Sequence, residues 1–598
     1  MFQILHRDSL SRIGELEING KKALTPLLLP VIHPFKPEPW VSEVKRLRVP
    51  AVITNSYTMR RGGFSPGHDI HSLINFAGIV MTDSGTFQEH MYGPLDAGNL
   101  EMVNYQVEVN SDIVTIRDVF SEAEHPEEQV ERDIYENYRR GLEALSQTKA
   151  YLALPVQGGL IKALRAKSAA LMSSLEGEYY PIGGIVPLME RYMYKEVVES
   201  ILISKMNLKT SRVIHAFGAG HPMFFPLLFL IGVDVVDSSA YIKYAKDGRI
   251  LTETGTLQLE DVTEDLPPSP YLDRYNKREI ENMSGDEKTK VLGLHNLYVS
   301  VKEIERIREE IRRENIWNYV EYRAHSHPLL LSAYRKVLEF YEYIEKFEPR
   351  SRKSPFLYLG EESLSRPIAV RLREILAEKG PCIDVPGKPY SYFVYEPVDC
   401  VKTGFGNMPL YFDETYPVAQ SIFPNENLSS AKSSEKFDEE PWREFLLQKV
   451  NHIFHYQFGK PLYSIVRKET VSLVRSKNTG KIRTVLLDGQ PAFSFRASDG
   501  LFSLTILGAG ILHDNFQKPR HRVVVDDEVA QFVRDGKNVF AKFVLDADPL
   551  LRPHDEAVVV DQEDRLIAFG RVLLSRDEMM DFDRGIALKN RIRSKDVS

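Results

Sequence analysis

The sequence contains little cysteine. Only two of its 598 residues, Cys382 and Cys400, carry a thiol. This number excludes a disulfide framework and a metal site built from cysteine alone. The chain also lacks an apolar run long enough to span a bilayer, and its N-terminus lacks the basic and then apolar pattern of a secretory signal. We therefore expect a cytoplasmic protein that does not interact with a membrane.

An excess of positive charge is missing as well. The chain has 76 Lys and Arg residues against 84 Asp and Glu residues, which gives a net charge of −8. Over the whole chain this balance disfavours a nucleic-acid partner, but such binding depends on local basic patches, so the question stays open. The length exceeds what one hydrophobic core can organise, and several domains are expected.

The first part of the chain changes from alternating to continuous apolar segments. Residues 1–22 alternate apolar and polar side chains and end in Asn19-Gly20, which predicts a small hairpin. Eight continuous apolar runs follow with helical stretches between them, a pattern typical of a parallel sheet. Eight such strands predict a closed (β/α)8 TIM barrel. The runs are Leu27–Ile32, Ala51–Asn55, Ile79–Asp83, Ile113–Asp118, Tyr151–Gln157, Ile182–Val186, Val213–Gly218 and Gly232–Asp237.

The rest of the chain predicts smaller domains after the barrel. The clearest helix is Pro126–Ser146, with proline and glutamate in its first turn. We predict an α/β protein with four domains: the barrel at 1–348, a small irregular domain at 349–435, a small α+β domain at 436–518 and a small β-barrel at 519–598. The strands expected in the last domain are His521–Val525, Val539–Leu545, Glu556–Val560 and Leu566–Leu574.

Several of the predicted barrel strands end in a side chain able to do chemistry. Asp83, Asp118 and Asp237 are carboxylates at strand ends, Gln157 is an amide, and Gly183-Gly184 leaves backbone open to a ligand. Each Asp alone fits a helix cap, but a parallel barrel brings all of them to one rim. There, one carboxylate can accept from a heterocycle, a second can attack a sugar C1′, and a third can move a proton. A sugar hydrolase fits this composition nearly as well.

Four ordered motifs carry a resemblance to a known family. The motifs are Asp83–Gln88, Pro181–Leu188, Phe217–Pro222 and Asp237–Tyr241, and the similarity continues through His325–Pro328, Thr415–Ser421 and the last domain. The chain resembles archaeosine tRNA-guanine transglycosylases over nearly its whole length, and its last domain resembles a PUA domain. The resemblance implies exchange of guanine 15 in the tRNA D-arm for the free base 7-cyano-7-deazaguanine (preQ0). We also expect a homodimer.

The resemblance assigns roles to the rim residues. It implies that Asp237 is the nucleophile at C1′ in one assignment; Asp83 is the nucleophile in another, and otherwise the general acid and base. Asp118, Gln157, Gly183, Gly184 and Phe87 would hold the base, with Phe87 stacking on it. The PUA domain and the two domains before it would grip the tRNA, and the basic residues expected to bind RNA are Lys518, Arg520, Arg522, Lys537 and Arg571.

The chain departs from the family at its zinc site. The family holds zinc with three cysteines and one histidine just after the barrel. The cysteine positions fall here on Pro267, Ser269 and Leu272, which are not zinc ligands, and His295 remains alone. We therefore expect no cofactor, a loop held by packing of Tyr271 and Leu272, and a His295 that is bonded to a neighbour.

The zinc loss raises an alternative, the related archaeosine synthase, which shares this architecture without the zinc ligands and modifies preQ0 already in tRNA. Its hallmark joins Pro-Cys to Lys-Pro-Tyr across three residues, with Ser and His following. Here five residues separate Cys382 from Lys388, and Phe393 and Glu396 stand where Ser and His should be. The intact Asp83 and Asp237 motifs favour base exchange. A non-catalytic tRNA-binding paralogue is a third alternative.

Overall fold

The computed structural model describes residues 2–86, 97–122, 124–376, 401–403, 405–408, 410–412, 414–423 and 439–592. The chain divides into two compact units. One consists of Met1–Arg312 with Tyr319–Phe340, and the other of Arg313–Asn318 with Tyr341–Ser598. Across the described ranges, no helix is both long and apolar enough to cross a membrane. The four predicted domain boundaries stay a prediction.

A small antiparallel sheet opens the first unit. It consists of β1 (Phe2–Asp8), β2 (Ser11–Ile18) and β3 (Lys21–Leu24). The turn between β2 and β3 places Asn19 and Gly20 at φ 50° and 75°, the left-handed region that a tight hairpin turn requires, so the predicted hairpin is confirmed. Leu16 and Ile18 share one hydrophobic cluster with the first residues of the barrel strands, so this sheet covers the amino-terminal end of the barrel.

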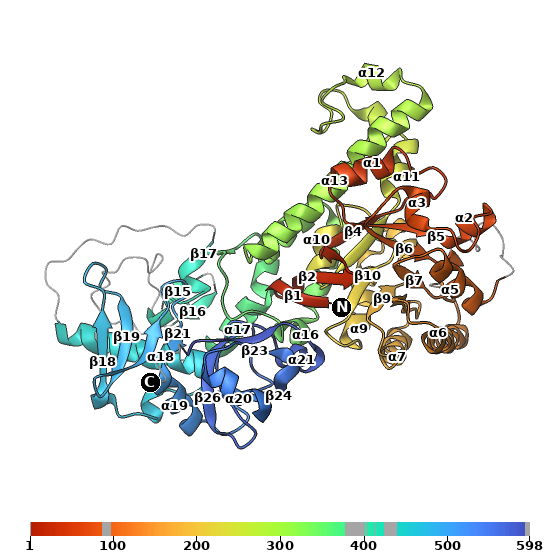
Figure 1. The fold of residues 1–598 in the computed structure, drawn as a ribbon. Coiled ribbons are helices and arrows are strands. Elements are labelled where there is room, and N and C mark those ends of the chain that lie inside the picture. Colours follow the sequence, from red (N-terminus) through yellow and green to blue (C-terminus); the bar gives the residue numbers. More distant parts are fainter. Residues whose placement is uncertain are drawn as a thin grey trace. The chain divides into compact units, whose positions relative to one another are not determined.

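Eight parallel strands form the predicted barrel (Figure 1). Their order is β4-β11-β10-β9-β8-β7-β6-β5. The two outer strands meet through a parallel bridge between Val31 and Ile53, where the Ile32 amide donates to the Ile53 carbonyl at 2.8 Å. The bounds are β4 Leu27–Pro30, β5 Ala51–Asn55, β6 Ile79–Asp83, β7 Ile113–Thr115, β8 Leu152–Ala153, β9 Tyr179–Ile182, β10 Val213–Ala216 and β11 Val235–Ser238.

Several of the predicted strand bounds were wrong by a few residues, and two of these differences affect the site. The strand predicted at Ile182–Val186 lies three residues earlier, because Gly184 has φ 74° and turns the chain into a helix. The run Tyr151–Gln157 contributes only β8, since Pro155 has no N–H to donate to a neighbouring strand. Both corrections move Gln157 and Gly183-Gly184 out of the strands and into the loops of the carboxyl rim.

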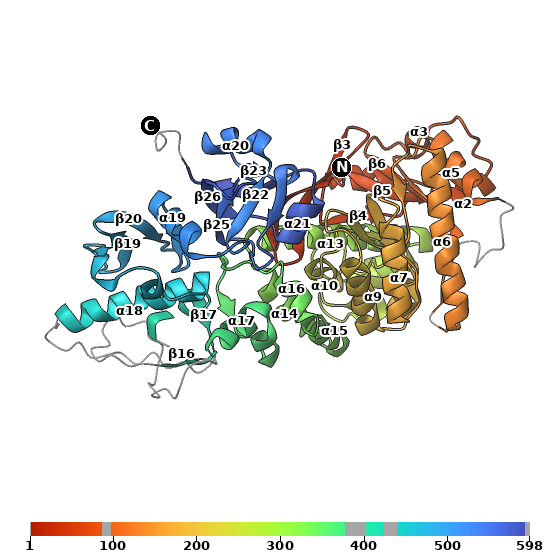
Figure 2. The same ribbon diagram turned by 90° about the horizontal axis from the view of Figure 1, so that it is seen from below.

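Helices cover the outside of the barrel, and α5, α6, α7 and α9 lie side by side (Figure 2). Helix α6 has Pro126 as its N-cap and two glutamates in its first turn, as predicted from the sequence. The helices are α1 Trp40–Arg46, α2 Ser56–Arg61, α3 Ile70–Ile74, α5 Asn99–Glu108, α6 Glu127–Gln147, α7 Lys162–Ser173, α8 Val186–Glu190, α9 Tyr194–Met206, α10 Phe225–Leu230 and α11 Ala240–Lys246.

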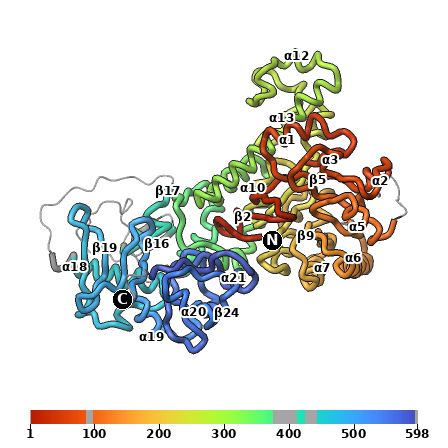
Figure 3. Tube along the Cα trace, viewed as in Figure 1, coloured from red at the N-terminus to blue at the C-terminus, as the bar shows by residue number. Residues whose placement is uncertain are grey.

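A long helix and a loop that packs on it follow the barrel strands. Helix α13 (Gly285–Arg312) packs against α11, and the short α12 (Lys277–Glu281) lies at its start (Figure 3). Between α11 and α12 the chain forms the hairpin of β12 (Arg249–Leu251) and β13 (Thr256–Gln258). Helices α14 (Ile316–Ala324) and α15 (Pro328–Leu338) come after α13.

The second unit contains a four-stranded antiparallel sheet and a six-stranded mixed sheet, in which β22 pairs in parallel with β25, and the two sheets share one hydrophobic core. Helix α18 (Glu439–Phe458) precedes a four-stranded sheet, and a six-stranded sheet of order β23-β27-β26-β25-β22-β24 ends the chain. The predicted strand Val539–Leu545 was wrong, because a 3-10 turn at Ala541–Phe543 divides it, and β27 was not predicted. The strands are β18 Val471–Arg475, β19 Ile482–Leu487, β20 Gln490–Phe495, β21 Phe502–Leu504, β22 Arg522–Val525, β23 Val539–Phe540, β24 Val544–Ala547, β25 Glu556–Val560, β26 Leu566–Val572 and β27 Ile586–Asn590.

Candidate active site at the carboxyl rim of the barrel

Three carboxylates meet at the carboxyl rim of the barrel. Asp83 is the last residue of β6, Asp237 is the next-to-last residue of β11, and Asp118 follows β7. The charges of Asp118 and Asp237 both raise the pKa of Asp83, so the three carboxylates lie near one another. The predicted convergence of the strand-end aspartates is therefore what the barrel produces.

Asp237 is held by a chain of hydrogen bonds. Its Oδ1 lies 2.9 Å from His215 Nε2 and accepts from the Gly218 amide at 2.6 Å. His215 Nδ1 in turn lies 3.0 Å from the Tyr179 hydroxyl. Because a carboxylate accepts, His215 donates through Nε2 and its Nδ1 accepts from Tyr179. The carboxylate is thereby fixed and its charge stabilised, while Oδ2 has no hydrogen bond within the described residues and is free to react.

His215 was not recognised as a site residue from the sequence. It lies inside the apolar run of β10 and is fully buried. The available signal was its position three residues before the strand's expected end at Gly218, in a run otherwise free of polar side chains. A buried histidine of this kind is more often a packing residue, and only the position of Asp237 on the neighbouring strand reveals its partner.

Asp83 is partly buried and accepts two hydrogen bonds. Asn55 Nδ2 donates at 3.1 Å and the Gly85 amide at 3.3 Å. Burial, with the nearby charge of Asp118, raises the pKa of Asp83 to about 7. Gly85 has φ 89°, and a Cβ there would lie 2.3 Å from Tyr57, so this tight turn requires glycine. A carboxyl group with a pKa near neutrality suits a group that both gives and takes a proton.

Asp118 and Gln157 form a second polar pair. Gln157 Nε2 donates to Asp118 at 2.6 Å, and burial raises the pKa of the Asp118 carboxyl. Gln157 Oε1 is buried and has no hydrogen-bond partner in the described structure. Buried polar atoms are nearly always paired, so this oxygen is a position where a ligand would donate an N–H.

The glycine pair lies directly against that amide. A Cβ on Gly183 would lie 2.2 Å from Gln157 Nε2, and a Cβ on Gly184 would lie 3.2 Å from Gln157 Oε1. The Gly184 N–H donates no hydrogen bond to the described residues. The rim therefore presents a free acceptor and a free donor side by side, which suits a flat ring carrying both N–H and carbonyl groups. Phe87, the predicted stacking residue, lies outside the described residues.

The residues predicted to bind RNA differ in how far they reach solvent. Lys518 and Lys537 are exposed, whereas Arg520 pairs with Asp548 at 3.2 Å. Arg522 is buried and gives its guanidinium to Asp564 and to three backbone carbonyls, so its position serves packing. Burial lowers the pKa of Arg571. The RNA-binding assignment thus rests on the two exposed lysines.

The segment in the place of the family's zinc site is fastened by the chain's own groups. His295 is buried, with Nδ1 2.9 Å from Ser269 Oγ and Nε2 3.0 Å from the Leu251 carbonyl. Since a carbonyl only accepts, Nε2 carries the proton and Ser269 donates to Nδ1, while Ser269 Oγ accepts from the Leu272 amide at 3.1 Å. We call this chain the Ser269–His295 clasp. The expected bonding of His295 to a neighbour is confirmed.

These residues do not fit a zinc ion. Both nitrogens of His295 are engaged, and burial lowers its pKa to about 4, which keeps the ring neutral in this bonded form. Leu272 is 1% exposed and packs against Ile250, Leu259 and Leu292, as predicted, and Tyr271 is partly buried and accepts a hydrogen bond from Arg46. Apolar packing occupies the positions where thiolates would converge on the metal.

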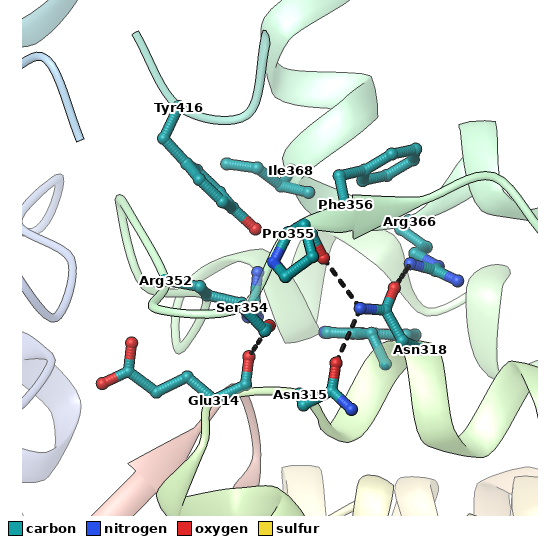
Figure 4. Close-up of a pocket in the computed structure, with 11 residues that line it drawn as sticks. Glu314, Asn315, Asn318, Arg352, Ser354, Pro355, Phe356, Arg366, Ile368 and Tyr416 are labelled. Atoms are coloured by element: carbon teal, nitrogen blue, oxygen red, sulfur yellow. Dashed lines mark hydrogen bonds between the residues drawn. The ribbon is translucent and has the colours of Figure 1, made fainter. Parts of the chain in front are cut away.

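A small pocket in the second unit differs from the barrel rim, because a polar side chain that lines it is bonded within the protein. Asn318 is one of its lining residues, and its Nδ2 donates to Asn315 and to the Pro355 carbonyl at 2.7 and 2.8 Å (Figure 4). Its Oδ1 accepts from Arg366 at 2.6 Å, and that guanidinium covers the Phe356 ring. The Asn318 side chain thus makes its hydrogen bonds within the protein and leaves none for a ligand. We therefore take the barrel rim, and not this pocket, as the candidate active site.

Comparison with known proteins agrees with this architecture. Residues 8–329 match the family model described as queuine tRNA-ribosyltransferase. Residues 448–519 match the patch-forming domain C2 of tRNA-guanine transglycosylase, and residues 521–592 match the PUA domain.

Similar proteins extend over the full chain. A protein of Methanococcus maripaludis (strain C7) is 38% identical over 642 residues, covering 98% of this chain and 99% of its own length. One of Pyrococcus furiosus is 39% identical over 597 residues, covering 99% and 97%. One of Methanocaldococcus jannaschii is 36% identical over 651 residues, covering 99% of each. All three carry the name tRNA-guanine(15) transglycosylase.

Proposed function

Because this chain belongs to the tRNA-guanine transglycosylase family, we propose that it exchanges guanine 15 in the tRNA D-arm for free preQ0. The observation that carries the proposal is the rim itself. It combines a fixed carboxylate, a carboxyl group whose pKa is raised to about 7, and the two loops that carry Gln157 and Gly183-Gly184. We call these two loops the recess, because we propose that they hold the base, and they present one unpaired acceptor and one unpaired donor. The proposal includes a cytoplasmic homodimer.

The first half of the reaction uses Asp237 and Asp83. Asp237 Oδ2 attacks C1′ of the nucleoside, the C1′–N9 bond breaks, and its electron pair leaves with the base. Asp83, protonated because of its raised pKa, gives a proton to the departing guanine. The product is a tRNA ribose bound covalently to Asp237, with free guanine in the recess.

The second half reverses these steps with another base. Asp83, now ionised, takes the N9 proton of preQ0, and N9 attacks C1′ and displaces the Asp237 carboxylate. Holding one carboxylate ready as nucleophile and a second near neutrality as acid and base requires different environments. His215 and the Gly218 amide supply the first environment, and burial beside Asp118 supplies the second.

The recess matches the edge of the base that the family's substrates share. Asp118 and Gln157 Oε1 are acceptors for ring and amino N–H groups, and the Gly184 N–H is a donor for the base carbonyl. Guanine and preQ0 carry the same groups on this edge, so one recess can accept both in turn.

The proposal is tested by incorporation of labelled guanine or preQ0 into an unmodified tRNA transcript without ATP. We expect label in the D-arm, and loss of label when position 15 of the transcript is not guanine. Conversion of preQ0-containing tRNA without any incorporation would replace base exchange with the synthase reaction. The Cys382–Glu396 segment that bears on this alternative lies outside the described residues.

A further inference from the structure

Arg165 is a buried positive charge next to the base recess. It lies on α7, is 1% exposed, and has no carboxylate partner within the described residues. Burial lowers the pKa of its guanidinium to about 10. Burying a charge without an ionic partner costs far more free energy than burying an apolar side chain of similar size. The fold therefore keeps an unfavourable group where methionine or leucine would pack more easily.

Three backbone carbonyls surround this guanidinium. Arg165 Nη1 donates to the carbonyls of Val156 and Gly183 at 3.1 and 3.0 Å, and Nη2 donates to the Gly159 carbonyl at 2.8 Å. Val156 and Gly159 flank Gln157, and Gly183 precedes Gly184. One planar group thus joins the two loops that present the recess's free acceptor and free donor.

The hydrogen bond from Arg165 to the Gly183 carbonyl acts directly on the Gly184 N–H. The Gly183 carbonyl and the Gly184 N–H belong to one peptide group, whose electrons are delocalised over both ends. The positively charged Arg165 guanidinium, bonded to the Gly183 carbonyl oxygen, draws electrons away from the Gly184 nitrogen and makes its N–H a stronger donor. A low dielectric constant enlarges this effect. The Gly184 N–H has no hydrogen-bond partner among the described residues.

We propose that Arg165 is a positioning residue that orders both recess loops and strengthens the Gly184 N–H as negative charge develops on the leaving base. This inference rests on the proposed function. When the C1′–N9 bond breaks, the electron pair moves onto the purine and spreads to its carbonyl oxygen, until Asp83 supplies the proton. A donor polarised by a fixed charge stabilises that oxygen most in the transition state.

The test compares Arg165→Ala with a matched variant, Arg308→Ala. Arg308 also donates to two carbonyls, those of Leu24 and Pro26, and burial lowers its pKa to about 10 as well, but it lies at the opposite end of the barrel. We expect Arg165→Ala to lower kcat for exchange by ~10²–10³-fold, the loss typical of one oxyanion donor. The Kd for tRNA should stay within about twofold for both variants, and Arg308→Ala should keep kcat.

Chemical rescue separates charge from shape. Millimolar guanidinium should restore exchange to Arg165→Ala, whereas urea, which is planar and donates N–H groups but is neutral, should not. Arg165→Lys keeps the charge and should retain more activity than Arg165→Ala. Equal rescue by urea, or an unchanged kcat in Arg165→Ala, would overturn the proposal.

Two further measurements keep the results separable. Circular dichroism and melting temperature establish that each variant is folded. If Arg165→Ala is unfolded, Arg165→Lys becomes the test, and its kcat must be lower than that of the wild type while its Kd for tRNA is unchanged. Wild-type exchange reports on the proposed function itself. If the wild type exchanges no base, calorimetric binding of free preQ0 still tests Arg165, because weaker binding by the variant supports the ordered recess and equal binding overturns it.

Discussion

At the scale of single residues, Asp83 links catalysis to pH. Its pKa, raised to about 7 by burial and by the charge of Asp118, makes it protonated below neutrality and ionised above. Release of guanine needs the protonated form. We therefore predict that single-turnover formation of the Asp237–ribose adduct falls as pH rises through about 7. In Asp118→Asn, where one like charge is gone, the inflection should move to lower pH; an unmoved inflection would assign it to another group.

The same raised pKa lowers the stability of the folded protein. In the unfolded chain Asp83 ionises near pH 4, but in the folded protein only near 7, so the folded state binds more protons between these values and stability decreases as pH rises. We predict that Asp83→Asn raises the melting temperature at pH 8 more than at pH 4. A calorimetric pH series measures this, and an equal shift at both values would contradict it.

Asp237 should act on the transition state and not on tRNA affinity. We predict that Asp237→Ala abolishes exchange while the Kd for tRNA stays close to that of the wild type, because phosphate contacts supply most of the affinity. Trapping the covalent adduct by denaturing electrophoresis tests the assignment. An adduct that survives in Asp237→Asn but disappears in Asp83→Asn would move the nucleophile to Asp83.

The sequence predicted those rim residues that carry a reactive side chain at the end of an apolar run. Asp83, Asp118 and Asp237 each follow an apolar run, and a parallel barrel brings such ends together. His215 and Arg165 escaped prediction for a physical reason. Their roles come from partners on other strands and loops, namely Asp237 and the Gly183 carbonyl, and nothing in the local pattern distinguishes them from packing residues.

At the scale of elements, the Ser269–His295 clasp fastens the segment where the resemblance places the family's zinc site. We predict that Ser269→Ala leaves the buried His295 Nδ1 unpaired and costs about 1–3 kcal/mol of the free energy of unfolding. Thr263→Ala, at an exposed position nearby, is the control. EDTA should leave the melting temperature and activity of the wild type unchanged. One tightly held zinc per chain by elemental analysis would refute the prediction.

Strand boundaries were harder to predict than the strands' existence. The eight runs were all recognised, because continuous apolar segments mark strands buried on both faces. Their ends depend on backbone geometry: Gly184 needs a left-handed φ, and Pro155 cannot donate to a ladder. Those same boundaries create the recess, so the part of the site that escaped prediction is the part formed by loops.

At the scale of the whole molecule, the second unit shares one core across its sheets. Val524 and Phe569 of the last sheet join the same cluster as Phe493 and Leu512 of the segment before it. Removing residues 519–598 would expose that core, so a truncation cannot report on RNA binding alone. Surface substitutions are the sounder test.

We predict that Lys518→Glu combined with Lys537→Glu weakens tRNA binding and lowers its dependence on salt. Each lost phosphate contact reduces the slope of log Kd against log salt by roughly 0.7–1. Binding measured from low to high salt gives the slope, with Lys477→Glu, at an exposed turn of the second unit, as the control. An unchanged slope would place the RNA-binding surface elsewhere.

The Ser269–His295 clasp also bears on what the protein needs from the cell in order to fold. A loop that depends on an ion matures only when the ion is delivered, and its folded yield follows nutrient status. Here every group in the fastening is encoded in the chain and is present once translation has passed His295. If the protein binds no zinc, as we predict, its maturation depends on synthesis alone, and cells starved of trace elements keep their normal pool of the folded protein.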